Sequence, residues 1–200
     1  MMKKVELLTV IIAAFFCTTA AFGMSEAFKE NLYDPGQLKP MDSVLKVKVG
    51  EPAPDFSLPS LSHEKISLSQ FKGKKNVVMS FVPAAWTPVC SDQWPGYNLA
   101  KELFEKNDAV LLGITVDNVP TLFAWTNQMG KLWFPVLSDF YPHGKTADTY
   151  GVLRSDGISE RALFIIDKAG ILRYMYVSDI NKRPDLKNIA AELEKLQSPQ

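Results

Sequence analysis

Short apolar runs alternate with helical patterns between residues 77 and 196, and this alternation limits the possible folds more than any other feature of the sequence. Short runs that are partly β-branched are typical of buried strands. Strands are predicted at residues 77–82, 109–116, 134–137, 162–167 and 171–177. The last two flank Lys168-Ala169-Gly170, which favours a hairpin.

The segments between and after these strands are predicted to be helical, at residues 91–106, 120–129, 145–150 and 184–196. In the first, Leu99, Leu103 and Phe104 mark the expected buried face, and Pro95-Gly96 is expected to kink or interrupt the helix. Strands that alternate with helices form a central sheet covered on both faces, and a closing hairpin adds antiparallel strands. The sequence therefore predicts an α/β protein with a thioredoxin-like fold, in which helices flank a central mixed β-sheet.

The composition excludes several classes of function. Basic and acidic residues number 22 each, so the net charge is zero, and no basic cluster suggests a nucleic-acid partner. The chain has two cysteines and two histidines, with no Cys-x-x-Cys or His-x-x-His spacing. We therefore expect neither a bound metal nor a cofactor, and no dithiol redox pair.

The first 23 residues have the layout of a secretory signal peptide. Lys3 and Lys4 precede an apolar run from Val5 to Phe16, and small residues follow up to Gly23. The apolar run is shorter than the roughly 20 residues that span a bilayer. We expect cleavage after Gly23 and a periplasmic or extracellular location. Cleavage after Ala21, or an uncleaved membrane anchor, are the alternatives.

The remaining chain divides into an N-terminal extension, residues 24–48, and a domain, residues 49–200. The extension mixes charged residues with Pro35-Gly36 and Pro40, and it is expected to lie on the domain or to lead into it. A lipoprotein anchor at Cys17 fits poorly, because Ala14-Phe15-Phe16 does not match the residues that such a signal requires. Signal cleavage would remove Cys17 and leave one cysteine in the exported protein.

That remaining cysteine, Cys90, follows the first buried strand and lies at or near the start of the next helix. The unpaired N–H groups and the partial positive charge of a helix N-terminus favour the thiolate over the thiol. An unpaired cysteine in an exported protein also suggests a reactive thiol. The alternative is a small buried apolar residue, and position alone leaves both readings open.

The residues around Cys90 resemble those of the peroxiredoxins. That family carries the pattern Pro-x-x-x-Thr-x-x-Cys, which Pro83, Thr87 and Cys90 match. The resemblance covers about residues 49–196. Four further segments are similar to motifs of the family, in the same order along the chain: Pro52-Ala53-Pro54-Asp55-Phe56, Leu137-Ser138-Asp139, Tyr150-Gly151-Val152 and Arg161-Ala162-Leu163-Phe164-Ile165-Ile166-Asp167.

The resemblance implies a thiol-dependent peroxidase that reduces hydrogen peroxide or organic hydroperoxides. Cys90 would be the peroxidatic cysteine and would be oxidised to a sulfenic acid. Arg161 would stabilise the thiolate and the charge on the departing oxygen. Thr87 would donate a hydrogen bond to the thiolate or to the peroxide, and Pro83 would shield the sulfur from water. The resemblance also implies a homodimer or a larger homo-oligomer.

Two departures from the family pattern affect these expectations. Gln93 stands where the family often has Glu, which places the local hydrogen-bond network in question. The exported chain would also lack a second, resolving cysteine. It therefore looks like a one-cysteine member of the alkyl hydroperoxide reductase and thiol-specific antioxidant type, similar to alkyl hydroperoxide reductase E. Its reductant would be an external thiol, either a thioredoxin-like protein or a small thiol.

Two other functions remain open from the sequence. One is an extracytoplasmic thiol–disulfide oxidoreductase on the same fold, although Gln93 occupies the place of the second cysteine of a Cys-x-x-Cys pair. The other is a non-enzymatic redox sensor, which the same thiolate could serve.

Overall fold

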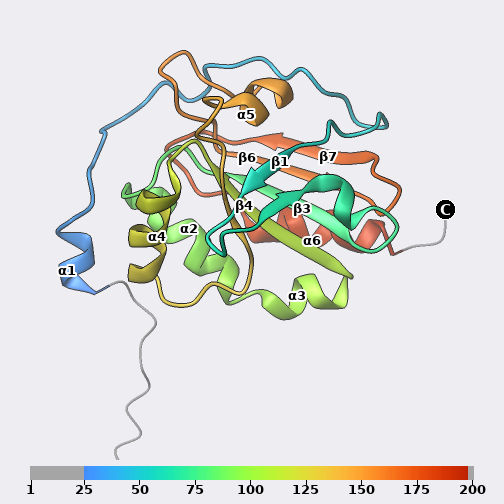
Figure 1. Ribbon diagram of the computed structural model, residues 1–200, viewed down its shortest axis with the longest axis horizontal. Helices are drawn as coiled ribbons and strands as arrows, with labels where there is room; N and C mark the ends of the chain where they lie inside the picture. Colours follow the sequence, from blue (N-terminus) through green and yellow to red (C-terminus); the bar gives the residue numbers. More distant parts are fainter. Residues whose placement is uncertain (1–24, 198–200) are drawn as a thin grey trace, which may run out of the picture.

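Five strands form the central sheet of the computed structural model, which describes residues 25–197 (Figure 1). In spatial order they are β5 (Val136–Ser138), β4 (Ala109–Thr115), β3 (Asn76–Phe81), β6 (Ala162–Ile166) and β7 (Leu172–Val177). Strands β3, β4 and β5 run parallel, whereas β6 pairs antiparallel with both β3 and β7. The sheet is therefore mixed, and the predicted α/β fold is confirmed.

Each face of the sheet carries its own layer of structure (Figure 1). One face is covered by α2 (Pro88–Asn98), α3 (Lys101–Lys106), α4 (Val119–Gln128) and α6 (Leu186–Lys195). The other is covered by α5 (Lys145–Tyr150), by the small hairpin of β1 (Ser57–Pro59) and β2 (Lys65–Ser67), and by a 3-10 helix, Leu68–Phe71.

The alternation of side chains along the strands divides the core between these two faces. In β3, Val78 packs toward α2 and α6, whereas Val77 and Met79 pack toward α5 and the small hairpin. In β4, Leu111 packs on the same face as Val78, and Leu112 packs on the opposite face with Val77 and Met79. Because successive side chains of a strand point to opposite faces, both layers of the core are filled from the same strands.

The predicted helix at residues 91–106 is instead two helices, and the break does not lie at Pro95. Helix α2 continues through Pro95 to Asn98, and α3 begins at Lys101. Trp94 and Tyr97 flank Pro95 and are buried, so their packing holds this turn helical despite the proline. The prediction that Leu99 belongs to the buried face is wrong, because Leu99 lies at the break and is exposed.

The other helix ends agree closely with the sequence pattern. Helix α5 covers the predicted residues and ends at Gly151, whose φ of +74° disfavours other residues. A Cβ at Gly151 would also lie 2.2 Å from the carbonyl oxygen of Val44. Helix α6 begins at Leu186 and not at Pro184, because the Asp185 side chain caps it by accepting from the Lys187 N–H at 2.9 Å.

The extension lies on the domain over its described length, residues 25–48, and apart from α1 (Glu26–Lys29) it is irregular (Figure 1). Its backbone contacts several separate parts of the domain. The N–H of Lys46 donates to the Tyr150 carbonyl at 3.3 Å, and the N–H of Asp42 donates to Glu160 Oε1 at 2.6 Å. The predicted signal peptide, residues 1–23, lies outside the described residues. Between residues 25 and 197, no helix has the length and apolar character needed to cross a membrane.

Candidate active site

Cys90 lies at the carboxyl end of β3, in the first turn of α2. The loop after Phe81 leads to Thr87, which has extended backbone angles and occupies the N-cap of α2. Pro88 follows at the first helical position, where its missing N–H removes no helical hydrogen bond. Cys90 is the third residue of the helix and is 1% exposed. Cys90 therefore lies in the first turn of a helix, where backbone N–H groups have no partner within the helix.

Arg161 reaches Cys90 from the adjacent strand. It directly precedes β6, the antiparallel neighbour of β3, and is 2% exposed. Its Nη2 donates to Cys90 Sγ at 3.5 Å, Nη1 donates to Gln93 Oε1 at 2.7 Å, and Nε donates to the Ile180 carbonyl at 3.0 Å. A buried guanidinium held by three acceptors places a fixed positive charge beside the sulfur.

Gln93 provides a neutral acceptor for Arg161. Its Nε2 donates to Ser80 Oγ at 3.1 Å and to the Tyr97 hydroxyl at 3.2 Å, so both ends of the amide are bonded. Burial raises the pKa of Tyr97, and this hydroxyl stays neutral. Because Gln93 carries no charge, it orients the guanidinium without cancelling its positive charge.

Thr87 and Pro83 line the same cavity as Cys90 and Arg161, so the structure brings the four predicted site residues together. The predicted use of the Thr87 hydroxyl as a donor to the sulfur differs from the geometry. Thr87 Oγ1 donates to the Ala84 carbonyl at 2.9 Å, within the same loop. Its oxygen can still accept a hydrogen bond, so it suits the O–H of a bound hydroperoxide.

The loop that carries Thr87 is held from two sides. The N–H of Ala85 donates to Asp117 Oδ2 at 2.8 Å, which ties the loop to the end of β4. Trp86 has a φ of +60°, a strained angle for this residue. From the extension, the Tyr33 N–H donates to the Trp86 carbonyl at 2.8 Å, and the Phe28 ring packs edge-on against the Trp86 ring. No sequence pattern links residues 28 and 33 to residue 86, and the sequence analysis missed these contacts.

A cavity of about 700 Å³ opens over Cys90. One side of it is formed by Cys90, Arg161 and the loop between β3 and α2, residues 82–87, which we call the active-site loop. The loop after β7 forms another side. The extension supplies Tyr33, Asp34, Pro35, Gly36, Gln37 and Leu38. A small electrophile that enters this cavity meets the thiol and the guanidinium at the same time.

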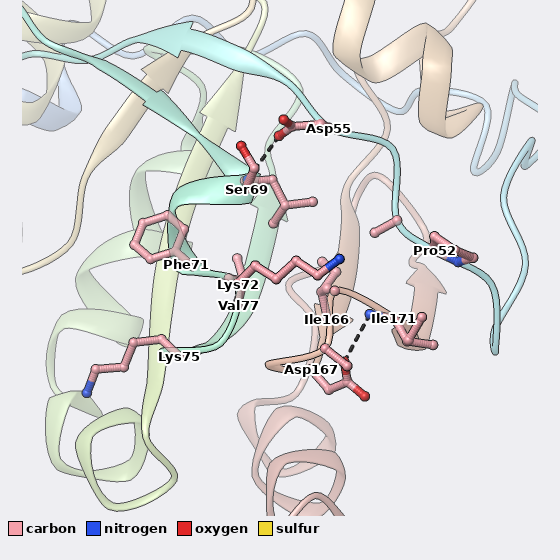
Figure 2. A pocket seen from close by; sticks show the side chains of 14 residues that line it. Pro52, Asp55, Ser69, Phe71, Lys72, Lys75, Val77, Ile166, Asp167 and Ile171 are labelled. Carbon is pink, nitrogen blue, oxygen red and sulfur yellow. Dashed lines mark hydrogen bonds between the residues drawn. The ribbon is translucent and has the colours of Figure 1, made fainter.

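A second, smaller cavity of about 190 Å³ lies at the other end of the sheet (Figure 2). It is lined by Val77, near the start of β3, whereas Cys90 follows the end of that strand. Its two carboxylates are bonded within the fold. Asp55 accepts from the Ser69 N–H at 3.0 Å, and Asp167 accepts from the Ile171 N–H at 2.9 Å, as the dashed lines in Figure 2 show. Asp55 therefore ties the segment before β1 to the 3-10 helix, and Asp167 stabilises the turn between β6 and β7.

Cys90 is a free thiol in this structure. Within residues 25–197 it is the single cysteine, so this part of the chain has no dithiol pair of the kind a thiol–disulfide oxidoreductase uses. The same residues contain no cluster of three or more metal-ligating side chains. The structure thus places one thiol and one guanidinium together at this site, with neutral hydrogen-bond partners around them.

Comparison with known proteins gives one consistent family. The model of the AhpC/TSA family matches residues 49–175. Alkyl hydroperoxide reductase E of Mycobacterium tuberculosis is 37% identical over 129 residues, which cover 64% of this chain and 84% of that protein. Peroxiredoxin-2 of Pongo abelii is 36% identical over 143 residues, which cover 66% of this chain and 79% of that protein.

Solved structures agree with the sequence comparison. The reduced 2-Cys peroxiredoxin of Plasmodium vivax superposes with a TM-score of 0.70 at 28% identity, covering 76% of this chain and 82% of that one. The structure of AhpC from Mycobacterium tuberculosis gives a TM-score of 0.69 at 25% identity, covering 76% of this chain and 94% of that one. The described part of the extension, residues 25–48, lies outside the family match.

Proposed function

Because the chain belongs to the AhpC/TSA family and is a peroxiredoxin-type thiol peroxidase, we propose that it follows a one-cysteine cycle in which Cys90 is oxidised and an external thiol restores it. The observation that carries this proposal is the buried Cys90 thiol, with Arg161 Nη2 3.5 Å from its sulfur, at a cavity open to small molecules. The cysteine content supports the single-cysteine form, since Cys90 is the single cysteine of residues 25–197 and the signal cleavage proposed below would remove Cys17.

The first step is nucleophilic attack by the Cys90 thiolate on the terminal oxygen of the hydroperoxide. An S–O bond forms as the O–O bond breaks, and the sulfur is oxidised by two electrons to the sulfenic acid. The other oxygen leaves as an alkoxide or hydroxide and takes up a proton, giving an alcohol or water. Arg161 stabilises the thiolate and the charge on the leaving oxygen. Thr87 accepts a hydrogen bond from the peroxide, and Pro83 limits access of water.

Two thiol molecules complete the cycle. The first condenses with the sulfenic acid, forms a mixed disulfide on Cys90 and releases water. The second attacks that disulfide and leaves Cys90 as the thiol, with the two reductant molecules joined as a disulfide. Two molecules of a small thiol satisfy this balance directly, whereas a thioredoxin-like protein would supply both thiols from one molecule and end with an internal disulfide.

Intact-mass measurement after one equivalent of peroxide tests the cycle. We expect the addition of one oxygen atom, and of a dimedone adduct when that reagent is present. With excess peroxide and no thiol, the mass should increase by further oxygen atoms as Cys90 becomes a sulfinic acid. A disulfide between Cys17 and Cys90, in place of a trappable sulfenic acid, would disprove the one-cysteine cycle.

We further propose that residues 1–23 direct export and that the protein works in the periplasm or outside the cell. The basic start, the apolar run and the small residues before Met24 support this. The mass of the protein recovered from cell fractions tests it. A mature chain that begins at Met24 supports export with cleavage, whereas a full-length chain in the cytoplasmic fraction would contradict it.

A homodimer or larger homo-oligomer is also proposed. Phe123, Phe140 and Tyr141 are exposed large apolar side chains that another copy of the chain would cover. Light scattering on the eluted protein measures its mass in solution. A mass equal to one chain at all concentrations would disprove the proposal.

A further inference from the structure

The extension forms part of the cavity that contains Cys90, and this arrangement suggests what the cavity selects. We propose that Tyr33, Pro35 and Leu38 form a binding wall for the organic group of a bulky, uncharged alkyl hydroperoxide, and that this wall determines the preference of the enzyme among peroxides. The inference rests on the proposed function, because it assumes that peroxide reaches Cys90 through this cavity.

The size of the cavity is the first observation. Its volume is about 700 Å³. A water molecule occupies about 30 Å³, and hydrogen peroxide has only one more oxygen atom. The volume of the cavity is therefore about ten times that of a hydrogen peroxide molecule. Volumes between roughly 300 and 1,000 Å³ are typical of sites for larger organic ligands. The space is therefore suited to a substrate with an organic group attached to the peroxide.

The chemistry of the walls is the second observation. The reacting groups are Cys90 and Arg161, and the extension contributes the polar Asp34 and Gln37 as well as the apolar surfaces of Tyr33, Pro35 and Leu38. Across the cavity, Ile158 and Ile180 add apolar surface. Such a cavity binds the peroxide group at one end and covers an apolar group at the other.

The third observation is that hydrogen bonds hold the binding wall in place at both of its ends. At one end, the Tyr33 N–H donates to the Trp86 carbonyl in the active-site loop at 2.8 Å. At the other end, Leu38 and Asn181 exchange two hydrogen bonds, each of 2.9 Å. Between them Gly36 has a φ of +69°, and its N–H donates to Asp34 Oδ1 at 2.9 Å in a tight turn.

The loop after β7 connects this wall to the catalytic arginine. The Ile180 carbonyl accepts from Arg161 Nε at 3.0 Å, and the Ile180 N–H donates to the Pro40 carbonyl in the extension at 3.1 Å. The next residue, Asn181, holds Leu38. Ile180 therefore bonds both the guanidinium and the extension, and the adjacent Asn181 holds Leu38, so one short loop connects the binding wall to Arg161.

The test compares two peroxides in a single turnover. The second-order rate constant for oxidation of reduced Cys90 is measured by stopped-flow fluorescence with cumene hydroperoxide and with hydrogen peroxide, with no reductant present. The quantity of interest is the rate constant for cumene hydroperoxide divided by that for hydrogen peroxide. We expect Tyr33→Ala and Leu38→Ala to lower this ratio by about three- to tenfold, because each variant removes apolar contact with the organic group only. Tyr33→Phe keeps the ring and should keep the ratio.

Val44→Ala is the matched control. Val44 also belongs to the extension, but its side chain is exposed and does not line the cavity, so this variant should leave both rate constants unchanged. A ratio that stays constant in Tyr33→Ala and Leu38→Ala would overturn the inference while leaving the peroxidase function intact. Failure of both peroxides to oxidise Cys90 in the unaltered protein would overturn the proposed function together with the inference.

Discussion

Arg161 and Gln93 form the shortest polar contact of the active site, with 2.7 Å between Nη1 of the arginine and Oε1 of the glutamine. This bond leaves Nη2 directed at Cys90 Sγ. Gln93 is itself held by Ser80 and Tyr97, so its amide cannot rotate away without breaking both bonds. Gln93 is therefore a positioning residue, since it acts on the thiol through the guanidinium.

Replacement of Gln93 separates its hydrogen bonding from its lack of charge. Gln93→Leu leaves Arg161 Nη1 and the Ser80 hydroxyl without their partner, and should lower the free energy of unfolding by about 1–3 kcal/mol. Gln93→Glu keeps an acceptor for Arg161, and the Ser80 and Tyr97 hydroxyls can rotate to donate to the carboxylate. It should keep the stability but slow the oxidation of Cys90 by peroxide in stopped-flow measurements, because the carboxylate partly cancels the positive charge that Arg161 offers to the leaving oxygen. Equal oxidation rates in Gln93→Glu and the unaltered protein would contradict this role.

Removal of the Arg161 side chain should slow peroxide attack. Arg161→Ala deletes the positive charge beside Cys90, and we expect the rate of oxidation to fall by roughly 10²- to 10³-fold. Arg161→Lys keeps the charge but cannot bond Gln93, Ile180 and Cys90 at once, so its loss should be smaller. Stopped-flow oxidation measures both variants, with circular dichroism as the check on folding. Unchanged oxidation in a folded Arg161→Ala variant would exclude the arginine from the reaction.

Cys90→Ser should abolish peroxidase activity while the fold survives. Serine is close to cysteine in size, and its hydroxyl can accept from Arg161 Nη2 as the sulfur does. We expect the free energy of unfolding to change by no more than about 1 kcal/mol. Peroxide consumption and circular dichroism measure the two effects. Retained turnover would show that another group reacts, and an unfolded variant would make Cys90 structural.

Docking of the extension should weaken in acid, because the hydrogen bond from Lys39 and those from Ser155 hold the pKa of Asp42 below its usual range. An unfolded Asp titrates near pH 4. A lowered pKa in the folded state means that Asp42 stabilises the fold fully above that pH, and that this stability is lost as the pH falls toward the lowered value. Asp42→Asn should therefore melt at a lower temperature than the unaltered protein at pH 7.

Comparison of the unaltered protein with Asp42→Asn at several pH values tests whether the Asp42 charge stabilises the fold. Their difference in melting temperature should shrink as the pH is lowered below about 4, where the unaltered Asp42 begins to lose its advantage. A difference that stays constant between pH 7 and pH 3 would show that Asp42 acts through shape and not through its charge.

Most of the fold was predictable because its strands are apolar and its turns carry clear signals. Gly151 ends α5 and Lys168-Ala169-Gly170 joins β6 to β7, as local backbone preference predicts. The interruption allowed for at Pro95 does not occur, for a different reason. Local preference disfavours helix there, whereas the buried Trp94 and Tyr97 hold the turn helical, and long-range packing cannot be deduced from the residues near a proline.

The candidate site was predictable where residues share one motif and not where distant segments meet. Pro83, Thr87 and Cys90 lie within eight residues, and Arg161 was placed by a family resemblance. The contribution of the extension was missed, because Leu38 meets Asn181 across 143 positions and nothing in either segment indicates the other. The donor role expected of Thr87 stays a prediction, since its hydroxyl donates to the neighbouring Ala84 carbonyl in this structure.

The anchoring of the extension has a consequence for the order in which the molecule is made. Leu38 and Pro40 emerge early from a ribosome, yet their partners Ile180 and Asn181 emerge only when the chain is nearly complete. All five strands of the central sheet end by Val177, before those partners exist. The wall over Cys90 can therefore form only after every strand of the sheet has been synthesised. A chain truncated after residue 178 would retain every strand of the sheet and the reactive thiol. Its N-terminal extension, however, would lack the hydrogen bonds that Ile180 and Asn181 make with Pro40 and Leu38.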